Sequence, residues 1–119
     1  MHFYFIGIKG TGMSALANIL VDLGHNVRGA DYCKKYFTEA TFRKSVIVEN
    51  FENCVLNKDF HYIIGNAFKL SKITSLIISG GYKYSYYSEF LEEFFTMKKI
   101  GISIMKKLLA LILSLALCL

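Results

Sequence analysis

A glycine-rich turn near the N-terminus, Gly7-Ile8-Lys9-Gly10-Thr11-Gly12, constrains the fold of this chain more than any other feature. The apolar run at residues 2–6 precedes the turn and predicts a β-strand. In residues 13–23, which follow it, apolar side chains recur at three- and four-residue intervals, at Leu16, Ile19, Leu20 and Leu23. That spacing predicts an α-helix with these four on one face. Strand, turn and helix in this order are typical of a parallel sheet covered by helices.

The same alternation continues along the chain and predicts an α/β fold. We expect a Rossmann-like three-layer architecture, in which helices flank a mostly parallel sheet of five or six strands. Gly24 predicts a left-handed end to the first helix. Further strands are expected at residues 26–30, 46–48, 62–64, 82–86 and 100–104. Further helices are expected at 38–44, 71–78 and 88–97, the last with Ser88 as its cap.

The glycine turn is suited to binding phosphate. It brings main-chain N–H groups to the N-terminus of a helix, where the helix dipole also favours an anion. Gly7 allows the tight turn, while Gly10 and Gly12 let the backbone approach a diphosphate. The pattern is not the GxGxxG dinucleotide fingerprint, because Lys9 stands where the second glycine belongs. The alternative is a turn that caps its helix and binds no ligand.

Two polar residues, one beside the turn and one within it, each have two interpretations. Asp31 ends the second predicted strand, where an acidic residue usually binds a ribose hydroxyl. Acidic residues at strand ends also cap the following turn, so that alternative stays open. Lys9 either touches a phosphate or is solvated.

Composition excludes several functional classes. A chain of 119 residues with 54% apolar content forms one ordinary domain. Its net charge of +5 is scattered, without a run of five basic residues, so a nucleic-acid partner is not expected. Cys33, Cys54 and Cys118 lack the spacing of a metal site or a disulfide framework. Without a signal peptide after Met1, a cytoplasmic location is expected. The sequence carries no signal for an oligomeric state.

Several stretches resemble one known family. They are residues 5–17 (FIGIKGTGMSALA), 22–31 (DLGHNVRGAD), 36–38, 64–68 (IGNAF), 88–91 (SEFL) and 99–103 (KIGIS). Together they look like the N-terminal domain of Mur ligases of the UDP-N-acetylmuramate:L-alanine ligase type. Met13-Ser14 after the last glycine of the turn is the discriminating detail. The resemblance covers residues 2–103, which we take as the domain, and leaves 104–119 as an unrelated apolar tail.

The resemblance implies a substrate site. The turn residues Gly7, Lys9, Gly10, Thr11, Gly12, Met13 and Ser14 would hold the diphosphate of UDP-N-acetylmuramate. Asp31 and Asn66 would lie near the uridine, although Asn66 could instead be a loop residue that bonds its own backbone. An aromatic set favours packing over base stacking: Tyr82, Tyr84, Tyr86, Tyr87, Phe90, Phe94 and Phe95.

The resemblance also implies a missing part. In this family the Gly-Ile-Ser segment continues into an ATP-binding loop, GTHGKTT, but no Gly-Lys-Thr or Gly-Lys-Ser occurs in this chain. ATP and magnesium would therefore belong to an absent central domain. We expect no catalytic residue, metal or cofactor within this chain, and no ligase activity from it alone. The alternative function is a non-catalytic module that binds NAD or a similar nucleotide.

The tail has three interpretations. Met105-Lys106-Lys107 followed by residues 108–119, apolar except for Ser114, resembles the start of an exported protein joined to a truncated domain. It could instead be an apolar C-terminal helix that covers the face of this domain that the missing domain would bury. The third interpretation is membrane contact through residues 108–119, which are fewer than the roughly 20 residues a spanning helix needs.

Overall fold

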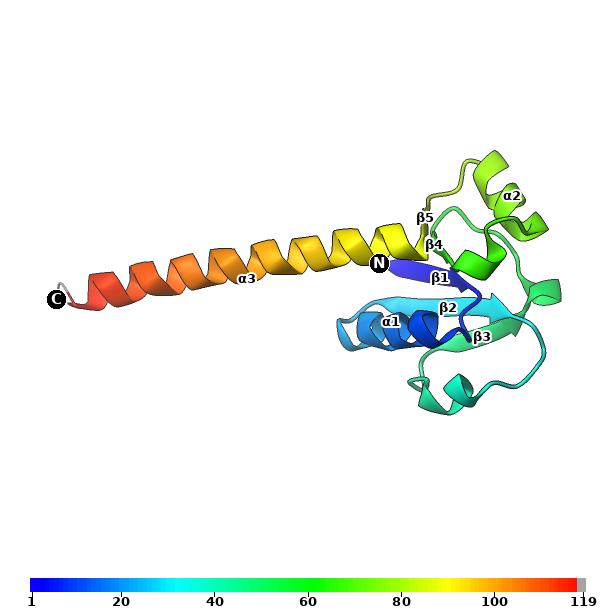
Figure 1. Ribbon diagram of the computed structural model, residues 1–119, viewed down its shortest axis with the longest axis horizontal. Helices are drawn as coiled ribbons and strands as arrows, with labels where there is room; N and C mark the ends of the chain where they lie inside the picture. The colour runs from blue at the N-terminus through cyan, green and yellow to red at the C-terminus, as the bar shows by residue number, and fades with distance from the viewer. Residues whose placement is uncertain (118–119) are drawn as a thin grey trace. The chain divides into compact units, whose positions relative to one another are not determined.

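The computed structural model describes residues 1–117 (Figure 1). Its strands are β1 (His2–Ile6), β2 (Asn26–Asp31), β3 (Ile47–Asn50), β4 (His61–Ile64) and β5 (Tyr84–Tyr86), and its α-helices are α1 (Thr11–Asp22), α2 (Lys72–Ser79) and α3 (Tyr87–Leu117). The chain divides into two compact units: Met1–Tyr87, which contains the sheet, and a second that begins at Ser88. The expected domain boundary after Ser103 falls inside α3.

The five strands form one sheet in the order β3-β2-β1-β4-β5, and every adjacent pair is parallel. The connection from β1 leads toward one edge of the sheet, and the connection from β4 leads toward the other. Because such crossovers are right-handed, α1 and α2 cover opposite faces. The predicted α/β fold, a Rossmann-like parallel sheet flanked by helices, is confirmed. Ligands of such sheets bind at the carboxyl ends of the strands where the order reverses, which here lies between β1 and β4.

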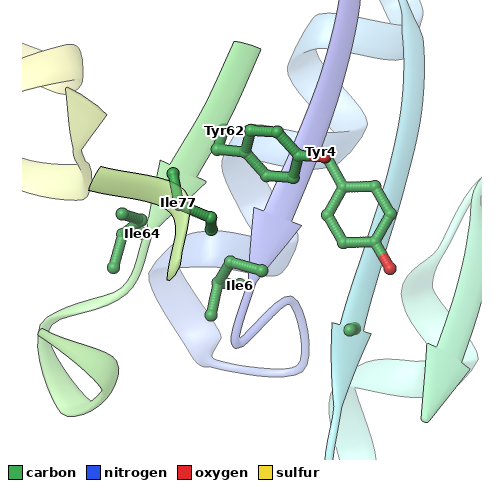
Figure 2. Close-up of a cluster of buried hydrophobic side chains, with 6 residues drawn as sticks. Tyr4, Ile6, Tyr62, Ile64 and Ile77 are labelled. Carbon is green, nitrogen blue, oxygen red and sulfur yellow. The ribbon is translucent and has the colours of Figure 1, made fainter. Parts of the chain in front are cut away.

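The central strand β1 is a continuous apolar run, as a parallel sheet covered on both faces requires. Tyr4 and Ile6 of β1 cluster with Tyr62 and Ile64 of β4 and with Ile77 of α2 (Figure 2). Phe3 and Phe5, which alternate with them along β1, are also buried. Strand β1 is therefore apolar on both faces.

Helix α1 packs through a face rotated from the predicted one. Leu16 and Leu20 are buried as expected, but Ile19 and Leu23 remain 44% and 45% exposed. Their places are taken by Met13 and the small Ala17, which complete an i, i+3, i+4, i+7 stripe with the two leucines. Gly24 has φ +91°, as its left-handed role predicts.

Other predicted elements differ in kind or extent. Residues 71–78 were predicted as a helix, and α2 indeed begins after its cap Ser71 and ends before Gly80. The helix expected at 38–44 is a short 3-10 helix, η1 (Phe37–Thr41). The strand expected at 100–104 is wrong: these residues continue α3, and Ser88 lies inside that helix instead of capping it. Leu, Lys and Met favour helix throughout this segment, and its only glycine is Gly101.

Removing the Ile77 side chain should test the α2 side of the core. We expect Ile77→Ala to lower the free energy of unfolding by about 2–5 kcal/mol, because it leaves a cavity between α2 and the sheet. Leu76→Ala is the matched control, since Leu76 is 48% exposed in the same helix. Urea unfolding measures both variants, and equal losses would contradict this packing.

Candidate functional site

The glycine turn is fastened to the end of β2 by main-chain hydrogen bonds. The N–H groups of Gly7 and Ile8 donate to the Ala30 carbonyl at 2.9 and 3.3 Å. The Lys9 N–H donates to Asp31 Oδ2 at 2.9 Å, and the Gly10 N–H returns to the Gly7 carbonyl at 3.1 Å. The amides of residues 7–10 are thus used within the protein.

The amides that face outward belong to the next three residues of the chain, at the start of α1. The first intrahelical bond runs from the Ser14 N–H to the Gly10 carbonyl at 2.8 Å, and no side chain caps the helix. The N–H groups of Thr11, Gly12 and Met13 therefore lack intrahelical acceptors. Thr11 is exposed and Gly12 half-buried. The capacity to bind an anion thus lies in the amides of Thr11, Gly12 and Met13 and not along the whole length of the turn.

Two glycines of the turn lie close against aromatic side chains. Gly7 has φ +89°, and a Cβ there would meet the Phe68 ring at 2.5 Å. A Cβ at Gly12 would meet the Tyr87 hydroxyl at 2.5 Å. Side chains at either position would push aromatic residues away from the start of α1.

A cleft of about 480 Å³ opens in front of these amides. Eight of the nine predicted site residues line it: Gly7, Lys9, Gly10, Thr11, Gly12, Met13, Asp31 and Asn66. Ser14 does not; it is buried, and its hydroxyl donates to the Thr11 carbonyl at 3.0 Å. The cleft lies at the switch point of the sheet and has the size of a small-molecule site.

Lys9 has a role that neither sequence-based alternative describes. Its side chain is only 6% exposed, so the solvated alternative is wrong. Its ammonium donates to the Tyr32 and Lys34 carbonyls, both at 2.9 Å, and lies 3.1 Å from Glu39 Oε1. Three acceptors match the three N–H bonds of an ammonium, so Lys9 has no donor left over for a phosphate in this arrangement.

The loop that Lys9 holds forms one wall of the cleft, through Tyr32, Tyr36 and Phe37. The buried Thr38 hydroxyl donates to the Lys9 carbonyl at 2.6 Å. The Tyr36 N–H donates to Glu39 at 2.8 Å. This bond first, and then the Lys9 ammonium, holds the pKa of the Glu39 carboxyl below its usual value.

Helix α1 fastens the far end of the same loop. The Asn18 amide donates to the Thr41 carbonyl and accepts from the Arg43 N–H, each at 2.9 Å. The Arg43 guanidinium donates two 3.0 Å hydrogen bonds to the Asp22 carboxylate. These bonds raise the pKa of the guanidinium and lower the pKa of the Asp22 carboxyl. The wall of the cleft is therefore tied to the glycine turn at one end and to α1 at the other.

Asp31 fits the turn-capping alternative. It is 4% exposed, and its two oxygens accept the N–H groups of Lys9 and Tyr32 at 2.9 and 2.7 Å. Asn66 is exposed at the start of the 3-10 helix η3 (Asn66–Phe68). Contacts of either residue with a uridine stay a prediction.

Aromatic residues contribute more to the site than the sequence indicated. Tyr82 and Tyr86 pack against the core, as predicted, but Tyr87 lines the cleft. Tyr32 and Phe68 line it too, and with Phe51 they form a cluster with ring centroids 5.2–5.6 Å apart. Only the position of Tyr32 directly after Asp31 could have identified it from the sequence.

Residues 2–112 match the Mur ligase family, catalytic domain. The chain belongs to the Mur ligase family. The matched range extends past Ser103, where the sequence resemblance was expected to end.

Similar proteins agree with this Mur ligase assignment. The chain is 42% identical over 95 residues to the UDP-N-acetylmuramate–L-alanine ligase of Streptococcus agalactiae serotype V, and 41% identical to that of Streptococcus thermophilus CNRZ 1066. Each alignment covers 77% of this chain and 21% of the relative. The crystal structure of a murein peptide ligase from Psychrobacter arcticus 273-4 superposes with a TM-score of 0.64 at 26% identity, covering 78% of this chain and 20% of that one. This Mur ligase chain thus spans about one fifth of the length of these relatives.

Metal-binding groups are not gathered in the part of the chain that the structure describes: among residues 1–117, no three His, Cys, Asp or Glu side chains could share an ion. Cys33 is exposed and Cys54 half-buried, both as free thiols. Cys118 lies outside the described residues.

Replacing Lys9 should loosen the wall of the cleft. Lys9→Met keeps much of the apolar stem but leaves two carbonyls without their donor. We therefore expect the free energy of unfolding to fall by about 1–3 kcal/mol. Lys44→Met is the control, because Lys44 is exposed. Thermal and urea unfolding report the change. Equal stability of the two variants would mean that the ammonium does not hold the loop.

Proposed function

We propose that this chain is the UDP-N-acetylmuramate-binding domain of a UDP-N-acetylmuramate:L-alanine ligase of peptidoglycan biosynthesis, and that it acts in the cytoplasm. The observation that carries the proposal is the set of three uncapped amides at the start of α1, which open on the cleft at the switch point. Family membership and the names of the streptococcal relatives support the choice of substrate.

In this proposal the diphosphate lies against the N–H groups of Thr11, Gly12 and Met13. Charge-assisted hydrogen bonds and the dipole of α1 would together stabilise the two negative phosphates. The glycine at position 12 leaves the backbone uncovered there. Asp31 and Asn66, on either side of the turn, line the parts of the cleft that would receive the uridine.

Lys9 then acts indirectly in our proposal. Its contacts with the loop at residues 32–39 would keep Tyr32, Tyr36 and Phe37 in position as the wall beside the substrate. A lysine in place of the second glycine of a dinucleotide fingerprint is consistent with this role. It also distinguishes the turn from a site built for NAD.

A proline at position 11 offers a sharp test. Thr11 is the first residue of α1, where proline is well tolerated, and Gly10 has the extended backbone (φ −59°, ψ 148°) that a following proline requires. Thr11→Pro therefore removes one amide donor and leaves the helix intact. We expect it to weaken UDP-N-acetylmuramate binding about tenfold in calorimetry, since one hydrogen bond to a charged group is lost.

Thr11→Ala is the matched control, because it removes the side chain and keeps the amide. It should bind like the unaltered chain. If Thr11→Pro binds equally well while both variants unfold at the same urea concentration, the amides at the start of α1 do not hold the ligand.

Ligand choice separates this proposal from a nucleotide-sensing module. UDP-N-acetylmuramate, present at 100 times its dissociation constant, should stabilise the chain by roughly 2.7 kcal/mol, whereas NAD should add nothing. If NAD stabilised the chain and UDP-N-acetylmuramate did not, the chain would instead be a module that binds NAD or a similar nucleotide.

Amide-bond formation should not occur with this chain alone. Activation of the muramate carboxyl needs ATP and magnesium, and the 119 residues contain no Gly-Lys-Thr or Gly-Lys-Ser loop to grip them. We expect no phosphate release above background when the purified chain is mixed with ATP, magnesium, L-alanine and UDP-N-acetylmuramate. Release that depends on both L-alanine and the UDP-sugar would contradict this expectation.

A further inference from the structure

Helix α3 is the long helix labelled in Figure 1. Its composition changes sharply along its length. Its first turns contain Glu89, Glu92 and Glu93, and no acidic residue follows Glu93 in the sequence. Four lysines come next, in two pairs, at positions 98–99 and 106–107. The stretch from Leu108 to Leu117 is then apolar except for Ser114.

The stretch at 108–117 is apolar on every side of the helix. Its leucines and isoleucine, 108, 109, 111, 112, 113, 115 and 117, are 53–89% exposed. A helix that packs on one partner needs a single apolar stripe, whereas a helix apolar all round suits a protein interior or lipid. A second copy of this helix would cover one stripe and leave the other sides in water.

The four lysines lie on one side of the helix, where they could contact a membrane surface together. At about 100° per residue, the pairs at 98–99 and 106–107 fall within about half of the helix circumference. Ile100, Ile104 and Met105 occupy the other half, and Ile102 lies among the lysines. The segment before Leu108 is therefore basic on one side and largely apolar on the other, as in helices that bind the surface of anionic bilayers.

The ten described residues of the apolar stretch, 108–117, can reach into one leaflet. Ten helical residues rise about 15 Å, which is half of the roughly 30 Å hydrocarbon thickness of a bilayer. By length and composition α3 could also cross a membrane, with a mean hydropathy of 2.0 in its most apolar 18-residue window. That crossing would place Lys106 and Lys107 deep in the hydrocarbon, where ammonium groups are costly. Insertion into one leaflet keeps both at headgroup level.

We propose that α3 binds an anionic lipid bilayer, with residues 108–117 inserted among the acyl chains, Lys106 and Lys107 at the phosphate level, and Lys98 and Lys99 on the water side of them. The same chain would thereby hold its nucleotide-sugar cleft close to a membrane. This inference does not depend on what the cleft binds.

Flotation with lipid vesicles tests the proposal on the full chain. The unaltered chain should float with vesicles of mixed phosphatidylcholine and phosphatidylglycerol, and a large part should stay bound in high salt, because acyl-chain contacts do not depend on charge. Ile112→Asp should reduce the bound fraction about tenfold or more, since it places a carboxylate among the acyl chains. Leu70→Asp is the matched control: Leu70 is 99% exposed in the sheet-containing unit, so binding should not change.

A charge variant separates the electrostatic contact of the lysines from the contact of residues 108–117 with the acyl chains. The double variant Lys106→Glu with Lys107→Glu should bind anionic vesicles about tenfold less and bind pure phosphatidylcholine vesicles almost as the unaltered chain does. The proposal is overturned if the unaltered chain does not float, if Ile112→Asp floats equally well, or if high salt releases all of the protein. It is also overturned if the chain forms a discrete soluble oligomer that does not dissociate when vesicles are added.

Discussion

Three consecutive N–H groups that bond to the end of β2 fix the geometry of this domain. Gly7 and Ile8 donate to the Ala30 carbonyl, and Lys9 donates to the Asp31 carboxylate. Without these bonds the chain leaving β1 would have no fixed direction, and α1 would not start over the switch point of the sheet. Because these bonds and the bond from the Gly10 N–H to the Gly7 carbonyl use the first four amides, those of Thr11, Gly12 and Met13 are the ones presented to the cleft.

The same residues connect the turn to the wall of the cleft. Asp31 accepts one N–H group from each side, and the Lys9 ammonium draws in two carbonyls of the loop that follows β2. A buried lysine is tolerated here because the carbonyls and Glu39 satisfy all three of its N–H bonds. The amides at the start of α1 and the aromatic wall of the cleft are thus parts of one hydrogen-bonded unit, as a preorganised binding site requires.

The sequence predicted those parts of the domain that local patterns control. β1 has the predicted bounds, and the turn lines the cleft as the strand–glycine–helix order indicated. The role of Lys9 was not predictable, because its partners lie 23 to 30 residues away in a loop without regular periodicity. The strand expected at 100–104 failed for a different reason: apolar β-branched residues in a short run fit both a strand and a helix. In α3 the helix-favouring lysines, leucines and methionine on both sides decide for the helix.

Amide chemical shifts give the most direct test of the proposed binding mode. In a ¹⁵N-correlated spectrum titrated with UDP-N-acetylmuramate, the account predicts large shifts for the Thr11, Gly12 and Met13 amides. The Gly7 and Lys9 amides, already bonded within the protein, should keep their slow hydrogen exchange with and without ligand. The account would be contradicted if the ligand bound without moving the three helix-start amides, or if Gly7 and Lys9 exchanged as fast as unbonded amides.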